Sequence, residues 1–147
     1  MNIKEHTTPD MLEKYSFLWS EVRLVIAALA LFLGGVPPVL LVLKGVGLVA
    51  TLLNLSWILS GVASVYLVYV WSKKGQTVFG GKQKYDLWAF WVMIVSGINL
   101  GVAGVLSQNI GMSISSNRVI FLVVGVLYLV SAYHLHRRFK ANGERVF

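Results

Sequence analysis

The chain has 147 residues, of which 56% are hydrophobic and only 13% are charged, and its formal net charge is +7. Soluble domains carry about 25% charged residues, so this composition excludes an ordinary water-soluble domain. The absence of cysteine excludes disulfides, thiolate metal sites and cysteine nucleophiles. The basic residues flank apolar runs that we expect to span a membrane, so we expect no binding to nucleic acid.

Four long runs contain no charged residue, at residues 24–43, 45–72, 87–117 and 119–136. About 20 residues of helix cross a bilayer core about 30 Å thick. Lipid offers no hydrogen bonds to the backbone, so each crossing must be helical. The sequence therefore predicts an all-α fold, an integral membrane four-helix bundle forming a single transmembrane domain over residues 1–147. The expected spans are about 24–43, 48–71, 87–107 and 118–136.

Residues 9–22 are expected to form an N-terminal amphipathic helix before the first span. Pro9 follows Thr8, the usual order of a helix cap and a first helical residue. Apolar side chains then recur every three or four positions, namely Met11, Leu12, Tyr15, Leu18, Trp19 and Val22. A helix of this kind beside a span typically lies in the lipid interface. The alternative is that its apolar stripe docks a partner.

The sequence Gly34-Gly35-Val36-Pro37-Pro38 interrupts the first apolar run. Proline removes a backbone donor and clashes with the preceding turn, so a helix kinks or ends there. We prefer a kinked span over residues 24–43, because Glu21 and Arg23 then stay at the surface. In the alternative, the span covers about residues 17–35 and residues 36–47 form an apolar connection.

Basic residues predict the orientation of the spans. Eleven lysines and arginines lie in the N-terminal segment, the loop 73–86 and the C-terminal tail, and only Lys44 and Arg118 lie in the two opposite loops. This bias indicates cytoplasmic termini and location in the plasma (inner) membrane. Anionic lipid head groups are the expected partners of seven cations, Lys73, Lys74, Lys82, Lys84, Arg137, Arg138 and Lys140.

Small residues predict how the second and third spans pack. Helices in lipid associate through close contact at small side chains, and these are Gly61, Ser64, Gly97, Gly101 and Gly104. Five polar residues also lie within the spans as polar contacts or possible pore lining: Asn54, Ser56, Ser60, Ser96 and Asn99. Asn54 and Asn99 fall at similar expected depths and could bond to each other. Alternatively, each amide bonds a nearby carbonyl or faces another subunit.

The sequence offers little for chemistry. The spans between Leu24 and His134 contain no ionisable residue, which argues against a proton-coupled pump. His134 and His136 point to nearly opposite sides of a helix, so we expect no metal site and no cofactor. Glu21 and Asp86 are expected to form salt bridges with Arg23, Arg137 or nearby lysines at the membrane edge.

These observations favour a small polytopic membrane protein that is not an enzyme. We expect a packing or accessory subunit that associates with copies of itself or with a larger membrane partner. The alternative is an oligomeric channel or carrier for a small neutral or weakly polar solute, lined by the five polar residues named above.

Overall fold

The computed structural model describes residues 8–34, 47–106 and 117–147 of the chain. These ranges contain four helices and no strand: α2 (Pro9–Phe32), α4 (Gly47–Lys73), α5 (Lys84–Leu106) and α7 (Arg118–Ala141). Each helix is long and apolar enough to cross a bilayer. The predicted all-helical fold with four apolar helices is thereby confirmed for the described part of the chain.

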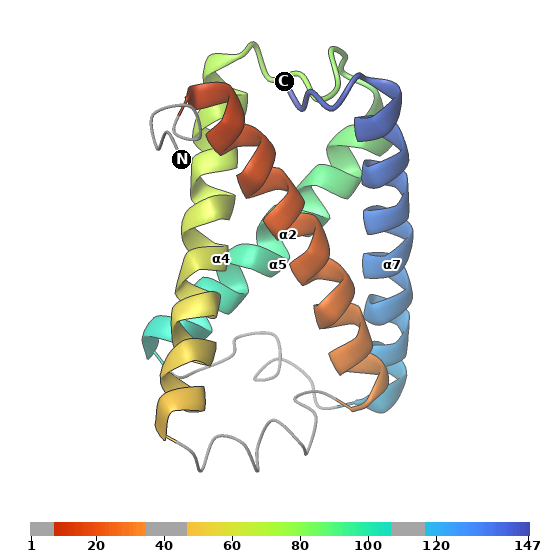
Figure 1. Ribbon diagram of the computed structural model, residues 1–147. Coiled ribbons are helices and arrows are strands. Elements are labelled where there is room, and N and C mark those ends of the chain that lie inside the picture. Colours follow the sequence, from red (N-terminus) through yellow and green to blue (C-terminus); the bar gives the residue numbers. More distant parts are fainter. Residues whose placement is uncertain (1–7, 35–46, 107–116) are drawn as a thin grey trace.

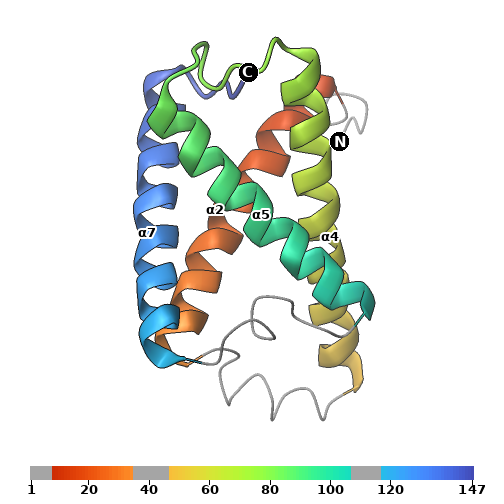
Figure 2. The same cartoon turned by 180° about the vertical axis from the view of Figure 1, so that it is seen from behind.

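Two of the four helices cross each other obliquely, and the other two flank them, one on each side. Figure 1 shows α4 at one side and α7 at the other, with α2 and α5 running obliquely between them and crossing. Figure 2 shows the same crossing from behind. Towards one end, α2 pairs with α4 through Glu13 and Lys74, while α5 pairs with α7 through Asp86 and His134. Beyond the crossing the pairs exchange, so that α2 meets α7 and α5 meets α4.

Helix α2 differs from the expected division into an interfacial helix and a separate span. It begins at Pro9 after Thr8, as predicted, and continues without a break through Arg23 to Phe32. No glycine or proline interrupts the helix before Gly34, which has φ +89°, so the predicted interfacial segment and the start of the predicted span belong to one helix. Residues 35–43 of the predicted first span lie outside the described residues. The alternatives of a kinked span and an apolar connection concern this same segment.

Helices α4 and α5 approach each other at two glycines. A Cβ atom built on Gly61 would lie 2.7 Å from the Cα of Gly101, and one built on Gly101 would lie 2.6 Å from the Cα of Gly61. Further along the contact, Gly97 faces Ser64 and Gly104 faces Ile58. Only glycine allows backbones to come this close, so the small residues of both helices are used inside the chain.

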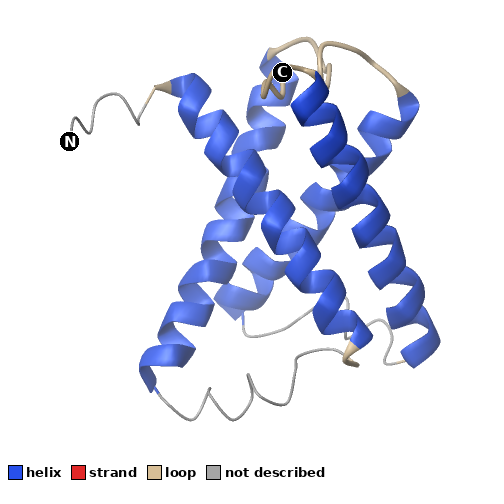
Figure 3. Cartoon of the chain, turned by 45° about the vertical axis from the view of Figure 1, so that its right-hand side comes forward, coloured by secondary structure: helices blue, strands red, loops and turns tan. Residues whose placement is uncertain are grey.

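One end of the molecule carries most of the basic side chains and is called the basic end below. It comprises the helix ends at Pro9, Lys73, Lys84 and Ala141, the loop 74–83 and residues 142–147. Figure 3 shows this loop and the C-terminal segment together. The N–H of Phe79 donates to the Val146 carbonyl at 2.7 Å, and aromatic rings pack beneath them, including Phe17, Phe90, Phe139 and Phe147.

The outer faces of all four helices are apolar. Large hydrophobic side chains are exposed along each of them, for example Ile26, Leu52, Val95 and Val123. In the most apolar 18-residue stretch of each helix, only 22% to 39% is buried inside the molecule. A surface this apolar is unfavourable in water and typical of helices that contact lipid.

Candidate functional site

The guanidinium of Arg23 is a buried polar group that lies between α2 and α5. Its side chain extends from α2 to α5, where Nη1 donates to the Ser96 hydroxyl at 3.0 Å and Nη2 donates to the Met93 carbonyl at 2.7 Å. Arg23 is only 6% exposed. The expectation that Arg23 lies at the surface is therefore wrong, because the continuous helix carries it to the place where α2 meets α5.

Several hydroxyl groups surround this guanidinium. Ser64 lies beside it, because Ser64 Oγ and Arg23 Nη2 both come within 3.0 Å of the point where a Gly97 Cβ would stand. Ser20 lies one turn before Arg23 on the same side of α2. We call this region the polar centre, and it consists of Trp19, Ser20, Arg23, Ser60, Ser64, Ser96 and the Met93 carbonyl.

The polar centre contains unused donors. The Nε–H of Arg23 and the hydroxyls of Ser20 and Ser64 are buried without a hydrogen-bond partner. The indole N–H of Trp19 donates to Ser60 Oγ at 3.1 Å, and that hydroxyl donates to the Ser56 carbonyl at 2.7 Å. All of these side chains can donate hydrogen bonds, and the two protein groups that accept from Arg23 are both uncharged.

Among the described residues, no carboxylate forms an ion pair with Arg23. Glu13 pairs with Lys74, Glu21 with His136, Asp86 with His134 and Arg138, and Glu144 with Lys14 and Lys140. Asp10 is exposed in the first turn of α2. Sequence reasoning missed this site, although Ser20 and Arg23 already share one side of a helix.

The two histidines of α7 connect it to two different helices. Nε2 of His134 lies 2.7 Å from Oδ1 of Asp86 on α5, and Nδ1 of His136 lies 2.9 Å from Oε1 of Glu21 on α2. Arg138 also holds Asp86, with Nη2 at 3.0 Å from Oδ2. Glu21 and Asp86 thus form salt bridges, as expected, but with partners on α7 and not with Arg23, Arg137 or lysines.

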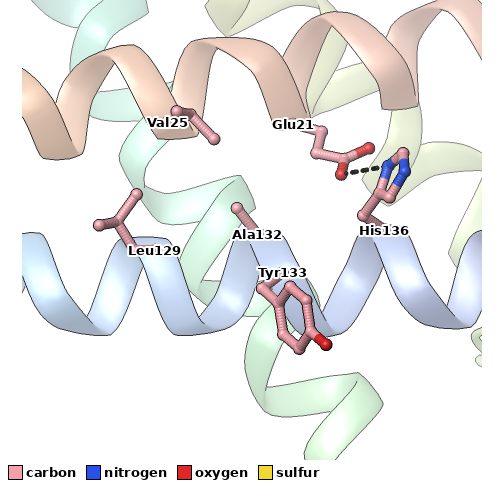
Figure 4. A pocket seen from close by; sticks show the side chains of 6 residues that line it. All are labelled: Glu21, Val25, Leu129, Ala132, Tyr133 and His136. Atoms are coloured by element: carbon pink, nitrogen blue, oxygen red, sulfur yellow. Dashed lines mark ion pairs between the residues drawn. The ribbon is translucent and has the colours of Figure 1, made fainter.

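A shallow groove of about 380 Å³ runs between α2 and α7 beside the Glu21–His136 pair. Figure 4 shows that the ion pair stands at one end of the groove. The remaining walls are mostly apolar and come from Val25, Leu129, Ala132 and Tyr133. The groove and the polar centre lie on different sides of α2, because Glu21 faces α7 whereas Arg23 faces α5.

The five residues predicted as polar contacts or pore lining do not gather in one place. Ser60 and Ser96 belong to the polar centre, whereas the Ser56 hydroxyl donates to the Leu53 carbonyl of its own helix. Asn54 and Asn99 are half-buried.

The predicted pairing of Asn54 with Asn99 does not fit the register of α4 and α5. The Asn54 carbonyl lies beside Gly104, 3.1 Å from the point where its Cβ would stand. Since Gly61 faces Gly101 and Gly97 faces Ser64, Asn99 falls opposite residue 62 or 63. That is about eight positions from Asn54, or about 12 Å along the helix axis. The similar depth was estimated with Gly47 and Gln108 as the outer span ends, and Gln108 lies outside the described residues.

Three of the seven cations proposed for lipid contact form ion pairs at the basic end. Lys74, Arg138 and Lys140 form ion pairs with Glu13, Asp86 and Glu144. The hydrogen bond to Glu13 raises the pKa of Lys74, and hydrogen bonds from Lys14 and Lys140 lower the pKa of Glu144 to about 2. The other cations proposed for lipid contact are exposed at this end, namely Lys73, Lys82, Lys84 and Arg137.

Comparison with known proteins yields no relative: no family model, no curated protein and no solved structure matches this chain. The fold and the polar centre therefore have to be interpreted from their own geometry.

Proposed function

We propose that this chain is a small polytopic membrane protein that acts as a non-catalytic packing or accessory subunit. One observation carries the proposal: the polar side chains between the helices tie helices of this chain to each other, and the outward faces are apolar. Trp19 and Arg23 join α2 to α4 and α5, while His134 and His136 join α7 to α5 and α2. What the chain offers a partner is therefore its apolar lateral surface and its exposed cations.

The proposed location is the plasma (inner) membrane, with both termini in the cytoplasm. In its support, the starts of α2 and α5 and the ends of α4 and α7 share the basic end with Phe147. Arg118 stands at the opposite end of α7. Positively charged helix ends face the cytoplasm in most membrane proteins. We also propose that the first turns of α2, including Tyr15, lie at the level of the lipid head groups.

Reporter fusions test this orientation. A fluorescent protein fused after Phe147 should fold and fluoresce, whereas a periplasmic alkaline phosphatase at the same position should be inactive. A phosphatase inserted after Asn117 should be active. The reverse pattern would refute the proposed topology. A chain that remained soluble after removal of all detergent would refute membrane insertion itself.

We propose that the subunit associates with copies of itself or with a larger membrane partner. Gly61 and Gly101 already contact each other between α4 and α5, so they are not available to a partner. The proposed association surface therefore consists of larger side chains on the exposed face of α4, such as Leu52, Leu59 and Val62. Native mass spectrometry of the protein extracted at its natural abundance should show a stable oligomer or one recurring membrane chain. Monomers without any such chain would contradict the accessory role.

The alternative function, a channel or carrier for a small neutral solute, has less support. Its five lining residues do not meet within one chain, and the residue at the helix crossing is the cation Arg23. A pathway would have to form between subunits, with Asn54 and Ser56 facing a common axis. Uptake of glycerol or urea into liposomes that is no faster with the protein than without it would exclude this alternative.

A further inference from the structure

The polar centre holds a positive charge that the described part of the chain does not neutralise. Arg23 is buried in the second half of α2, and the two groups that accept its hydrogen bonds are the neutral Ser96 hydroxyl and Met93 carbonyl. An uncompensated buried charge is strongly unfavourable. The cost is larger within a bilayer, where ionisable residues usually mark a functional site.

The groups that remain unbonded around Arg23 can all donate a hydrogen bond, the Nε–H as a donor only and the two hydroxyls as donors or acceptors. Its own Nε–H and the hydroxyls of Ser20 and Ser64 are buried without a partner, with Ser20 and Ser64 both 0% exposed. Buried polar groups in folded proteins nearly always have partners. A cluster of unsatisfied donors next to an unpaired cation is complementary to a negatively charged acceptor.

The side chains around Arg23 are closely packed. A Cβ on Gly97 would lie 1.9 Å from Ser64 Oγ and 3.0 Å from Arg23 Nη2, so glycine at this position leaves the space to that hydroxyl and the guanidinium. A single guanidinium also balances a single negative charge. A monovalent, monatomic ion therefore matches this closely packed centre better than a phosphate, which is larger and carries more charge.

We propose that the polar centre binds a small monovalent inorganic anion of the halide class. The anion accepts hydrogen bonds from Arg23 Nε and from the hydroxyls of Ser20 and Ser64, and it neutralises the guanidinium where α2 crosses α5. In this role the anion is a structural ligand that holds α2, α4 and α5 together.

Thermal unfolding of the purified full chain in detergent tests the proposal. The unfolding temperature is measured in sodium chloride and in sodium gluconate at equal ionic strength, over a range of concentrations. Gluconate is too large for the polar centre, so only chloride should raise the unfolding temperature, with a saturating dependence. Equal unfolding temperatures in the two salts at every concentration would overturn the proposal.

Variants assign the effect to the polar centre. Arg23→Gln should abolish the chloride dependence, whereas the matched Arg137→Gln, which removes an exposed arginine at the basic end, should retain it. Ser64→Ala leaves the charge in place and should weaken the apparent chloride affinity at least threefold, which keeps the test valid if Arg23→Gln does not fold. Equal losses in Arg23→Gln and Arg137→Gln, or an unchanged affinity in Ser64→Ala, would overturn the proposal.

A Glu5 variant tests whether the counterion of Arg23 is a free anion or a carboxylate of the chain itself. Glu5 is the acidic residue that lies outside the described ranges. If a free anion fills the polar centre, Glu5→Gln should keep the chloride dependence of the original chain. If chloride stabilised Glu5→Gln but not the original chain, the Glu5 carboxylate would be the counterion and the proposal would be wrong.

Discussion

His134 and His136 lie two positions apart on α7 and contact carboxylates on two different helices. His134 reaches Asp86 on α5 at 2.7 Å, and His136 reaches Glu21 on α2 at 2.9 Å. Because the two side chains point to opposite sides, α7 is held on both flanks near the basic end. This arrangement makes the ion pairs of α7 the first features to test by mutation.

Asp86→Asn should destabilise the bundle by about 1–3 kcal/mol, because it removes a fully buried carboxylate that bonds to Arg138 and His134, whose side chains are 31% and 35% exposed. The free energy of unfolding in mixed micelles, followed by tryptophan fluorescence, measures the change. The control is Asp10→Asn, which removes an exposed carboxylate in the first turn of α2 and should change stability by under about 0.5 kcal/mol. Similar losses in both variants would show that Asp86 has no special role.

Gly61→Ala should force α4 and α5 apart, because its Cβ would lie 2.7 Å from the Cα of Gly101. We expect a loss of about 1–3 kcal/mol, the usual range for overpacking, measured by the same unfolding assay. Gly47→Ala is the matched control, since nothing lies within 4 Å of a Cβ at that position. A Gly61→Ala variant as stable as the control would contradict the glycine contact.

Cysteine pairs test the register of α4 and α5 directly, because the chain contains no cysteine of its own. Ile58→Cys with Gly104→Cys should form a disulfide on mild oxidation, since the Ile58 backbone nitrogen lies 3.0 Å from the position of a Gly104 Cβ. Asn54→Cys with Asn99→Cys should remain reduced. The shift in gel mobility reports each outcome, and cross-linking of the second pair alone would refute the register.

The lowered pKa of the Glu144 carboxyl predicts how the stability of the fold depends on pH. Its pKa is lowered from 4.5 to about 2 by hydrogen bonds from Lys14 and Lys140. A carboxyl with a lowered pKa in the folded state stabilises the fold above its unfolded pKa, and this contribution disappears as pH falls towards 2. Glu144→Gln should therefore unfold at a slightly lower temperature than the original chain at pH 7. The difference should shrink below pH 4.5 and vanish near pH 2, and a difference independent of pH would contradict this assignment.

The sequence by itself determined the helices and their polarity. Long uncharged runs can satisfy their backbone only as helices, and this periodicity is local, so it needs no knowledge of neighbours. The clustering of cations beside the runs likewise indicated the basic end. The sequence also showed that His134 and His136 diverge, since side chains two positions apart on a helix point to nearly opposite sides.

Only the tertiary structure decided where α2 and α5 cross and what meets at that crossing. Counting uncharged residues put Arg23 at the boundary of a span, whereas the unbroken helix from Pro9 to Phe32 carries it into the middle of the bundle. The register of Gly61 against Gly101 likewise separates Asn54 from Asn99. Contacts between helices depend on the angle and offset at which side chains interlock, and this information is shared between distant segments and absent from each one alone.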